Sequence, residues 1–396
     1  MLATTLCWAL LALSSSAAVA RIPSEHAAAG CHAVTIPVPV SATNVRFTLP
    51  TVDDSLEAVQ WAIEDSRRTN VNRTSGTIAI NQTFSIATQL CVPAHGAKKD
   101  HLQILTHGHF ANHKYWDVRV QPEEYSQVES LLAAGYSVLN YDRLTVGDSE
   151  RPDAYAVAQT QVEVEILRHL VLMARDGRLL HLAPAPAPTT QFNKIIVVGH
   201  SYGSKLTLAL LAQYSALVDA AIINGQLPPV TGDAEPVGAS LIFGPRFAAE
   251  ADPIRWRGYG SGYIAMADLH TLQMTFFARR DAGYPSGFDD ALLAYAWDEV
   301  STPLAAGEWL SRGLVRSLPG PAFGGPVLFF NGERDVAACL ADCRGLFNAT
   351  AAAGVFPDAE AVDWYLQPGA GHGLPFHRNA SAGYQVMSEW LGSHGL

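Results

Sequence analysis

The stretch Lys194–Gly203, KIIVVGHSYG, constrains the fold more than any other part of the chain. After Lys194 come four β-branched apolar residues, Ile195–Val198, which are typical of a strand that is buried on both faces. The pattern G-x-S-x-G follows at once, and a segment rich in Leu and Ala continues beyond it. A strand, a tight turn centred on Ser201 and then a helix form the arrangement that lifts a serine hydroxyl to the edge of a sheet.

The two glycines of this turn have a steric explanation. A side chain at Gly199 or Gly203 would crowd the neighbouring strand or helix, and the turn holds Ser201 in a strained backbone conformation. The helix that begins after the turn directs its N-terminus toward the serine, which favours a developing negative charge there. We therefore predict that Ser201 is a nucleophile.

A serine hydroxyl is a weak nucleophile until an imidazole takes its proton, and that imidazole needs a carboxylate on its other nitrogen. Asp335 follows an expected strand at 326–331, and His372 follows an expected strand at 361–366. The carboxyl ends of parallel strands meet at one edge of a sheet, so both side chains are expected beside Ser201. The order Ser, Asp, His along the chain fits this arrangement.

Three other residues compete for these roles. Glu333 is an alternative acid, and His377 is an alternative base on the same loop as His372. Asp142 also follows a strand, but it precedes the serine in sequence, and the adjacent Arg143 offers it an ion-pair partner.

The sequence also predicts where an oxyanion would be held. Thr106–Phe110, THGHF, comes directly after an expected strand at 101–105. We assign one backbone N–H donor to His109, with Phe110 next to it, and the other to Tyr202, the residue after the nucleophile. His107 is expected to brace the loop with its side chain.

Taken together, GHSYG, THGHF, GERD and GAGHG resemble the α/β-hydrolase superfamily from about Cys91 to the C-terminus. YWD at 115–117, YDRLTVGDSERPD at 141–153 and the two cysteines after GERD look like secreted fungal hydrolases of the alpha/beta-hydrolase-1 type. That subgroup often has glycine where this chain has Thr145, a difference that concerns the backbone of the turn and not the three catalytic candidates. The resemblance implies the fold and hydrolase chemistry, but no particular substrate.

The expected architecture is an α/β-hydrolase fold, a mostly parallel sheet with helices on both faces and an antiparallel N-terminal edge at 31–49 and 77–92. The core spans 21–224 and 322–396, and a mainly helical cap is inserted at 225–321. Helices are expected at 54–66 and 122–134 in the core and at 264–278 in the cap. Five aromatic residues of the cap are candidates to line an apolar pocket: Trp256, Tyr259, Tyr263, Phe276 and Phe277.

Residues 1–20 are predicted to be a signal peptide, with an apolar core at Leu6–Leu13 and a small-residue cleavage site before Arg21. Secretion is consistent with four glycosylation sequons, at Asn72, Asn81, Asn348 and Asn379. Apart from Cys7 in the signal peptide, four cysteines remain: Cys31, Cys91, Cys339 and Cys343. Three pairings are possible, and Cys31–Cys91 with Cys339–Cys343 is favoured over a metal site.

A net charge of −11 disfavours binding to nucleic acid or to an anionic membrane, and no transmembrane segment follows residue 20. We expect a secreted serine hydrolase that cleaves a small, apolar carboxylic ester, lactone or thioester through an acyl-enzyme on Ser201, with no metal or organic cofactor. The alternatives are a narrow secondary-metabolite hydrolase or acyltransferase, a peptidase, and a non-catalytic binding protein. The oligomeric state stays open.

Overall fold

The computed structural model describes residues 30–48, 50–66, 73–93, 95–96, 98–182, 191–228, 239–278, 287–314 and 322–396. The predicted signal peptide and Asn72 lie outside the described residues, as do parts of the predicted cap. Within the described ranges, no helix combines the length and apolar character needed to cross a membrane.

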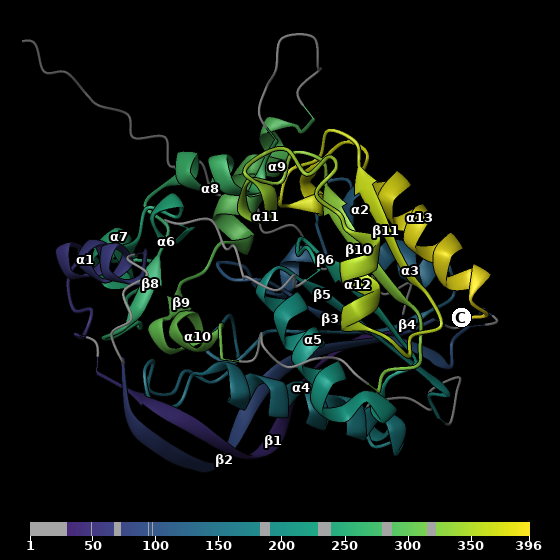
Figure 1. The fold of residues 1–396 in the computed structure, drawn as a ribbon, viewed down its shortest axis with the longest axis horizontal. Helices are drawn as coiled ribbons and strands as arrows, with labels where there is room; N and C mark the ends of the chain where they lie inside the picture. Colours follow the sequence, from purple (N-terminus) through teal and green to yellow (C-terminus); the bar gives the residue numbers. More distant parts are fainter. Residues whose placement is uncertain are drawn as a thin grey trace, which may run out of the picture.

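An eight-stranded sheet forms the centre of the molecule (Figure 1). Its spatial order is β1-β2-β4-β3-β5-β6-β10-β11. The strands are β1 (Gly30–Phe47), β2 (Thr74–Val92), β3 (His101–Thr106), β4 (Ser137–Tyr141), β5 (Lys194–His200), β6 (Ala220–Asn224), β10 (Val327–Gly332) and β11 (Val362–Gln367). Only the pairs β1–β2 and β2–β4 are antiparallel, and the others are parallel. The mostly parallel sheet with an antiparallel N-terminal edge confirms the predicted fold class.

Helices cover both faces of this sheet because its central strands carry buried apolar side chains on each face. Ile195 and Val197 of β5 pack into one buried cluster, and Ile196 and Val198 pack into another on the opposite face. On the first side lie α4 (Thr160–Arg175) and α5 (Tyr202–Tyr214), and on the other lie α2 (Pro122–Tyr125), α3 (Gln127–Ala133) and α13 (Ala380–Ser393).

The segment between β6 and β10 forms a separate group of short elements. It contains α6 (Ala239–Ile242), α7 (Ala248–Ala251), α8 (Leu269–Phe276), α9 (Asp290–Tyr295), a π-helical turn (Ala296–Val300) and α10 (Ala306–Ser311). It also contains a small antiparallel sheet of β7 (Arg246–Phe247), β8 (Tyr263–Ala265) and β9 (Leu304–Ala305), which the sequence did not predict. Two short helices follow β10, namely α11 (Val336–Cys339) and α12 (Ala349–Val355).

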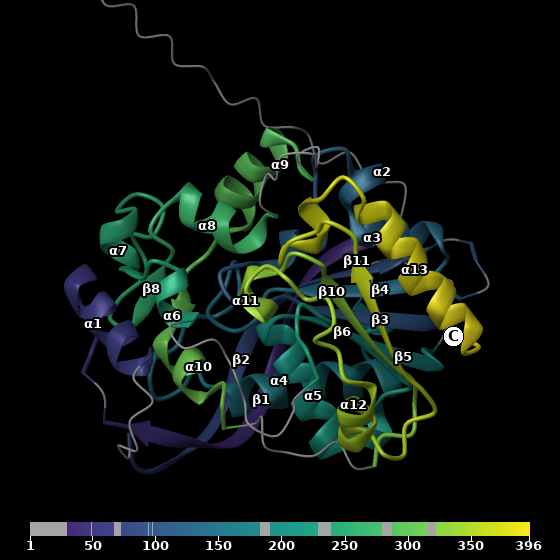
Figure 2. The same cartoon turned by 45° about the horizontal axis from the view of Figure 1, so that its top comes forward.

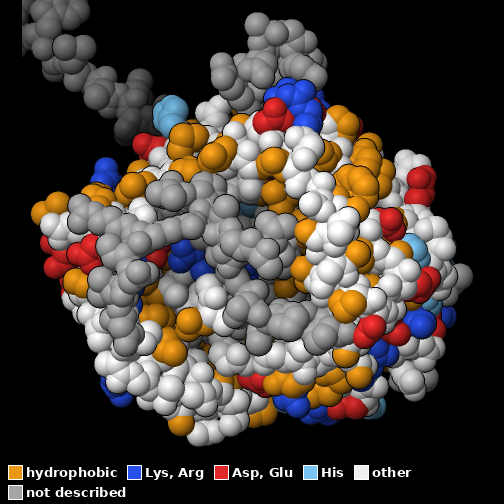
Figure 3. Space-filling model, in the orientation of Figure 1, with side chains coloured by type: hydrophobic (Ala, Val, Ile, Leu, Met, Phe, Trp, Pro, Cys, Tyr) orange, Lys and Arg blue, Asp and Glu red, His pale blue; other side chains and the backbone are white. Residues whose placement is uncertain are grey.

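The N-terminal strands reach this inserted segment. β1 and β2 form a long hairpin whose connection carries α1 (Ser55–Ser66), and α1 packs against α6 and β7. Figure 2 shows α1 beside α6, α7 and β8, at the far end of the molecule from α13. On the face drawn in Figure 3, positive and negative side chains are interspersed around the rim.

Candidate active site

Ser201 lies in a sharp turn between β5 and α5, with φ 53° and ψ −113°. The turn requires its two glycines. A Cβ at Gly203 would lie 2.0 Å from the Thr106 carbonyl oxygen, and one at Gly199 would lie 2.5 Å from the Gly203 carbonyl oxygen. Both are closer than real Cβ contacts, which confirms the crowding expected from the sequence.

Asp335 and His372 form a close pair at the same edge of the sheet. His372 Nδ1 lies 2.7 Å from Asp335 Oδ2, and both side chains are buried. Asp335 follows β10 and caps the N-terminus of α11, where its Oδ1 accepts the N–H of Ala338 at 2.8 Å. The carboxylate is therefore fixed through one oxygen and pairs with the imidazole through the other.

His200, the residue before Ser201, connects the serine turn to the loop of His372. Its Nε2 lies 2.8 Å from the His372 carbonyl oxygen, and burial lowers the pKa of its imidazole well below the usual value. A neutral ring that donates from Nε2 satisfies both observations. Gly225 lies between the two rings, since a Cβ there would be 3.0 Å from His200 Nε2 and 3.1 Å from His372 Cε1. The sequence did not indicate this role, although His200 is part of the G-x-S-x-G motif.

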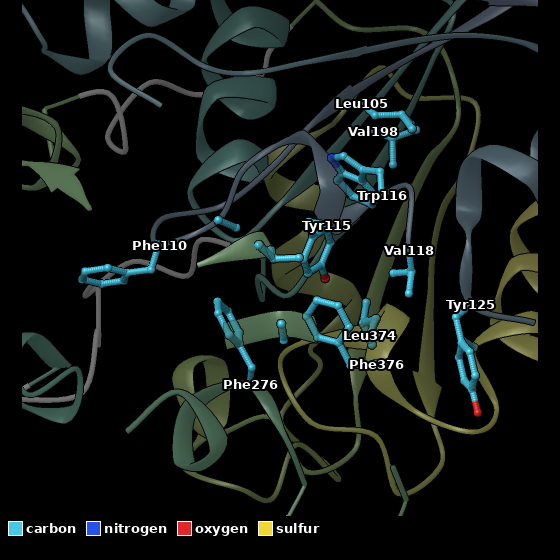
Figure 4. Close-up of a cluster of buried hydrophobic side chains, with 14 of the residues drawn as sticks. Leu105, Phe110, Tyr115, Trp116, Val118, Tyr125, Val198, Phe276, Leu374 and Phe376 are labelled. Atoms are coloured by element: carbon cyan, nitrogen blue, oxygen red, sulfur yellow. The ribbon is translucent and has the colours of Figure 1, made fainter. Parts of the chain in front are cut away.

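Aromatic rings enclose these two histidines, and Figure 4 shows Tyr115, Phe276 and Phe376 converging. The Tyr115 ring stacks on His200 with 4.4 Å between centroids, and Phe276 lies parallel to His372 at 5.8 Å. Phe276 comes from the inserted segment, and its carbonyl oxygen accepts the Gly373 N–H at 2.7 Å.

The five aromatic residues that were candidates for one pocket do not lie together. Phe276 reaches His372, whereas Phe277 packs against Phe288 with 4.6 Å between ring centroids. Trp256, Tyr259 and Tyr263 form a separate buried cluster with parts of the small sheet. Closeness in the sequence did not place these residues in one pocket, because consecutive residues of the short elements point to different sides.

The THGHF loop runs directly against the serine turn. A Cβ on Gly108 would lie 2.9 Å from Ser201 Cβ, and Phe110 has a φ of 55°. His107 braces the loop, because its Nε2 accepts the Arg143 N–H at 3.1 Å and its Nδ1 lies 2.9 Å from the Gly108 carbonyl oxygen. Burial, together with the nearby Arg143 guanidinium, lowers the pKa of His107 to about 3, which keeps the ring neutral. The assignment of Tyr202, His109 and Phe110 as oxyanion donors stays a prediction.

A sequence profile of the alpha/beta hydrolase family matches residues 103–382. The chain belongs to this family. A search of curated proteins found no match.

Solved structures agree on the fold of this alpha/beta hydrolase. A thermophilic esterase from Thermogutta terrifontis, with malate bound, aligns with a TM-score of 0.52 and 17% identity over 79% of this chain and 95% of that one. A carboxylesterase structure from Nitrososphaera gargenis aligns with a TM-score of 0.51 and 14% identity, over 79% and 96% of the two chains. At these identities the likeness supports the architecture alone.

The two alternative acids, Asp142 and Glu333, form hydrogen bonds with groups other than His372. Asp142 Oδ1 accepts from the His113 backbone N–H at 2.9 Å and lies 2.8 Å from His113 Nδ1. Burial acts to raise the pKa of Asp142, but the hydrogen bonds and charge interaction of His113, together with the charge interaction of His107, lower the pKa overall. The expected partner Arg143 is engaged elsewhere. Glu333 Oε2 accepts the Gly369 N–H at 2.8 Å, which connects the loop of Asp335 to that of His372.

The alternative base, His377, is also engaged by backbone groups. Its Nε2 accepts from the N–H groups of Gly371 at 2.9 Å and Ala278 at 3.1 Å, and its Nδ1 lies 2.9 Å from the Gly373 carbonyl oxygen. Burial lowers its pKa to about 4. Both ring nitrogens therefore support the loop around His372.

A buried ionic cluster lies behind the THGHF loop. Arg143 Nη1 contacts Glu163 Oε2 at 2.6 Å, and Arg143 Nη2 contacts Glu308 Oε2 at 3.2 Å. Burial raises the pKa of Glu163 well above its usual value despite Arg143, and the nearby Glu308 adds to the rise. Glu308 belongs to the inserted segment, and its Oε2 lies 3.7 Å from His109 Nε2. No sequence motif indicated it.

The structure forms the favoured disulfide pairs, Cys31–Cys91 and Cys339–Cys343. Asn81 and Asn348 are exposed. The Asn379 side-chain nitrogen donates to the Pro368 carbonyl oxygen at 2.9 Å, a bond that a glycan on the same nitrogen would have to replace. Glycosylation of these residues stays a prediction.

Proposed function

We propose that this alpha/beta hydrolase is a serine hydrolase that cleaves a small carboxylic ester, or a related lactone or thioester. The pairing of His372 Nδ1 with Asp335 Oδ2 at 2.7 Å, at the sheet edge that also carries the turn of Ser201, supports this proposal most directly. The pair leaves the second imidazole nitrogen, Nε2, to act on the serine hydroxyl.

In the proposed reaction, His372 removes the proton from Ser201 as the serine oxygen attacks the ester carbonyl. Asp335 fixes the imidazole tautomer and stabilises the imidazolium that forms. The backbone N–H groups of Tyr202 and His109 hold the oxyanion, and the start of α5 favours the same charge. The imidazolium then protonates the leaving alcohol, and water releases the acyl group by the same steps.

An apolar substrate is favoured by the rings near the site. Phe276 lies parallel to the His372 ring, and Phe110 packs against Phe243 with 5.0 Å between ring centroids. Secretion is part of the proposal as well and is supported by the two disulfides, which persist in oxidising compartments. The N-terminal residue of protein recovered from the culture medium, expected to be Arg21, tests secretion.

The first experiment is hydrolysis of p-nitrophenyl esters from acetate to palmitate by the wild type and Ser201→Ala. We expect kcat/KM to fall by at least about 10⁴-fold, because the nucleophile is lost. Asp335→Asn should lose a comparable factor and Glu333→Gln far less, since Glu333 contacts a backbone N–H. Equal activity of the wild type and Ser201→Ala would refute the assignment of Ser201.

A fluorophosphonate probe separates the rival functions. Labelling of Ser201 without ester hydrolysis would indicate a specialised substrate or acyl transfer to an alcohol. A wild type that neither labels nor hydrolyses any ester would favour a binding protein.

A further inference from the structure

The loop after β10 folds back onto Asp335. The Asp335 carbonyl oxygen accepts the N–H groups of Cys339 at 3.2 Å and Ala341 at 2.9 Å, while Oδ1 accepts the N–H of Ala338 at 2.8 Å. Cys343 closes the loop, because its N–H donates to the Glu333 carbonyl oxygen at 3.0 Å. The backbone of this loop therefore holds the carboxylate that pairs with His372.

Two consecutive residues of the loop have a left-handed backbone that glycine adopts far more readily. Leu340 has a φ of 53° and Ala341 a φ of 72°. Packing does not explain why Leu340 keeps this conformation, since its side chain is 64% exposed. The Cys339–Cys343 disulfide spans both residues and brings its two Cα atoms to 5.2 Å. The bridge is thus the covalent constraint across the strained turn.

We propose that the Cys339–Cys343 disulfide is a positioning element that holds the Asp335 carboxylate against His372 by keeping Leu340 and Ala341 left-handed. The inference rests on the proposed function, because it takes Asp335 to be the acid that orients His372. Without the bridge, the two residues can relax, which shifts the Ala341 N–H and the turn that presents the Ala338 N–H.

The same loop also touches the His372 loop through its backbone. The Arg334 N–H donates to the Ala370 carbonyl oxygen at 2.8 Å, and Glu333 binds the Gly369 N–H. A shift of the loop therefore disturbs the acid and the segment that carries the base together.

The second disulfide provides a matched control. Cys31–Cys91 joins residues 60 apart in β1 and β2, whereas Cys339–Cys343 joins residues only 4 apart. A bridge restricts the unfolded chain more when it closes a longer loop, so the first bridge should matter more for stability. The two bridges thus predict opposite patterns of loss.

The test compares Cys339→Ala/Cys343→Ala with Cys31→Ala/Cys91→Ala in ester hydrolysis, in fluorophosphonate labelling and in thermal unfolding. For the first variant we expect kcat and the labelling rate to fall about tenfold or more with KM nearly unchanged, because the catalytic geometry is lost and the fold is kept. Its Tm should fall less than that of the second variant, because the bridge closes a shorter loop. For the second we expect a lower Tm with kcat retained. An unchanged kcat and labelling rate in Cys339→Ala/Cys343→Ala would overturn the proposal.

A rescue experiment tests the backbone mechanism. Adding Leu340→Gly and Ala341→Gly to the bridgeless variant should recover at least about threefold in kcat, since glycine adopts a positive φ without strain. Adding Leu340→Ala alone shortens the same exposed side chain but keeps the Cβ, and it should recover nothing. Equal recovery in both would contradict the role of the left-handed residues.

Reversible reduction covers the case in which the bridgeless variant fails to fold. In Cys31→Ala/Cys91→Ala, dithiothreitol would convert the remaining bridge to two thiols and itself become a cyclic disulfide, and thiol alkylation followed by mass spectrometry counts the thiols. Labelling of Ser201 should slow on reduction and recover on reoxidation, and an unchanged rate with two free thiols would overturn the inference. A wild type that never labels would instead refute the proposed function.

Discussion

Thr145 has a strained backbone, and its side chain makes a buried hydrogen bond. Its φ is 75°, a value that a β-branched residue adopts only at a cost in free energy. The hydroxyl donates to Glu308 Oε1 at 2.7 Å, whereas Arg143 pairs with the other oxygen of this buried carboxylate, Oε2. The threonine at this position therefore couples the turn after β4 to the inserted segment.

We expect Thr145→Val to lower the free energy of unfolding by about 2 kcal/mol, because a buried carboxylate loses a hydrogen-bond donor while the strain remains. Thr207→Val is the control: its hydroxyl is equally buried, and it has no hydrogen-bond partner among the described residues. That variant should be neutral or slightly stabilising. Urea unfolding measures both, and equal losses would contradict the role of the bond to Glu308.

At the scale of single residues, the sequence predicted the place of those side chains that directly follow a strand. Ser201, Asp335 and His372 could be placed at one edge because the β5, β10 and β11 patterns are clear. Glu308 could not, since it reaches the site from an inserted segment with no repeating pattern. Phe276 was one of five aromatic candidates, and the sequence did not distinguish it from the other four. The choice between His372 and His377 also depends on which backbone N–H groups occupy the ring nitrogens, and composition does not show that.

At the scale of elements, α1 fastens the inserted segment to the N-terminal hairpin. Asp65 Oδ2 accepts from Trp309 Nε1 at 2.7 Å and lies 3.2 Å from Arg312 Nη2. The Trp61 ring meets the Trp309 ring edge-on, with 6.3 Å between centroids. The segment between β6 and β10 is therefore held from outside as well as by its own two connections to the sheet.

Trp61→Ala should lower the free energy of unfolding by about 3 kcal/mol, because it removes a nearly fully buried ring. We expect hydrogen exchange to accelerate first in β7, β8 and β9, while β5 and β6 stay protected. Leu56→Ala on the same helix removes a side chain that is 67% exposed and should change stability by less than about 0.5 kcal/mol. A uniform acceleration of hydrogen exchange over the whole chain would contradict a local role of α1 in holding the inserted segment.

Element boundaries were predicted well where a periodic pattern is long. The expected helix at 54–66 is α1, and the expected strand at 77–92 is β2, which begins slightly earlier. The single helix expected at 122–134 is instead two helices, because Ser126 has an extended backbone and caps α3 with its side chain. The helix expected at 264–278 begins at Leu269, since its first residues pair in the small sheet.

At the scale of the whole molecule, buried neutral histidines make stability depend on pH. The pKa of His107 falls to about 3 and that of His377 to about 4, in both cases first because of burial. The unfolded chain takes up protons below about pH 6.5, while the folded rings stay neutral until the lower values. Their contribution is thus present above pH 6.5 and is lost as the pH falls toward 4 and then 3.

We expect the free energy of unfolding, measured in urea from pH 7 to pH 4, to fall more steeply in the wild type than in His377→Gln. Glutamine cannot take up the proton, so the difference in slope should approach one proton between pH 6.5 and 4, a total of about 3 kcal/mol. The comparison uses slopes because the substitution also changes the stability at pH 7. Parallel curves would contradict a neutral, buried His377.

The long N-terminal hairpin has a consequence for where the domain can be cut. The family profile begins at residue 103, inside β3, so it leaves out β1, β2 and α1. Yet Ile36, Val38 and Phe84 of that hairpin are completely buried on the face that carries α4. A fragment that starts at residue 103, where the family match begins, would expose the edge of β4 and an apolar surface beneath it. The segment that matches the family profile is therefore shorter than the segment that can be expected to fold on its own.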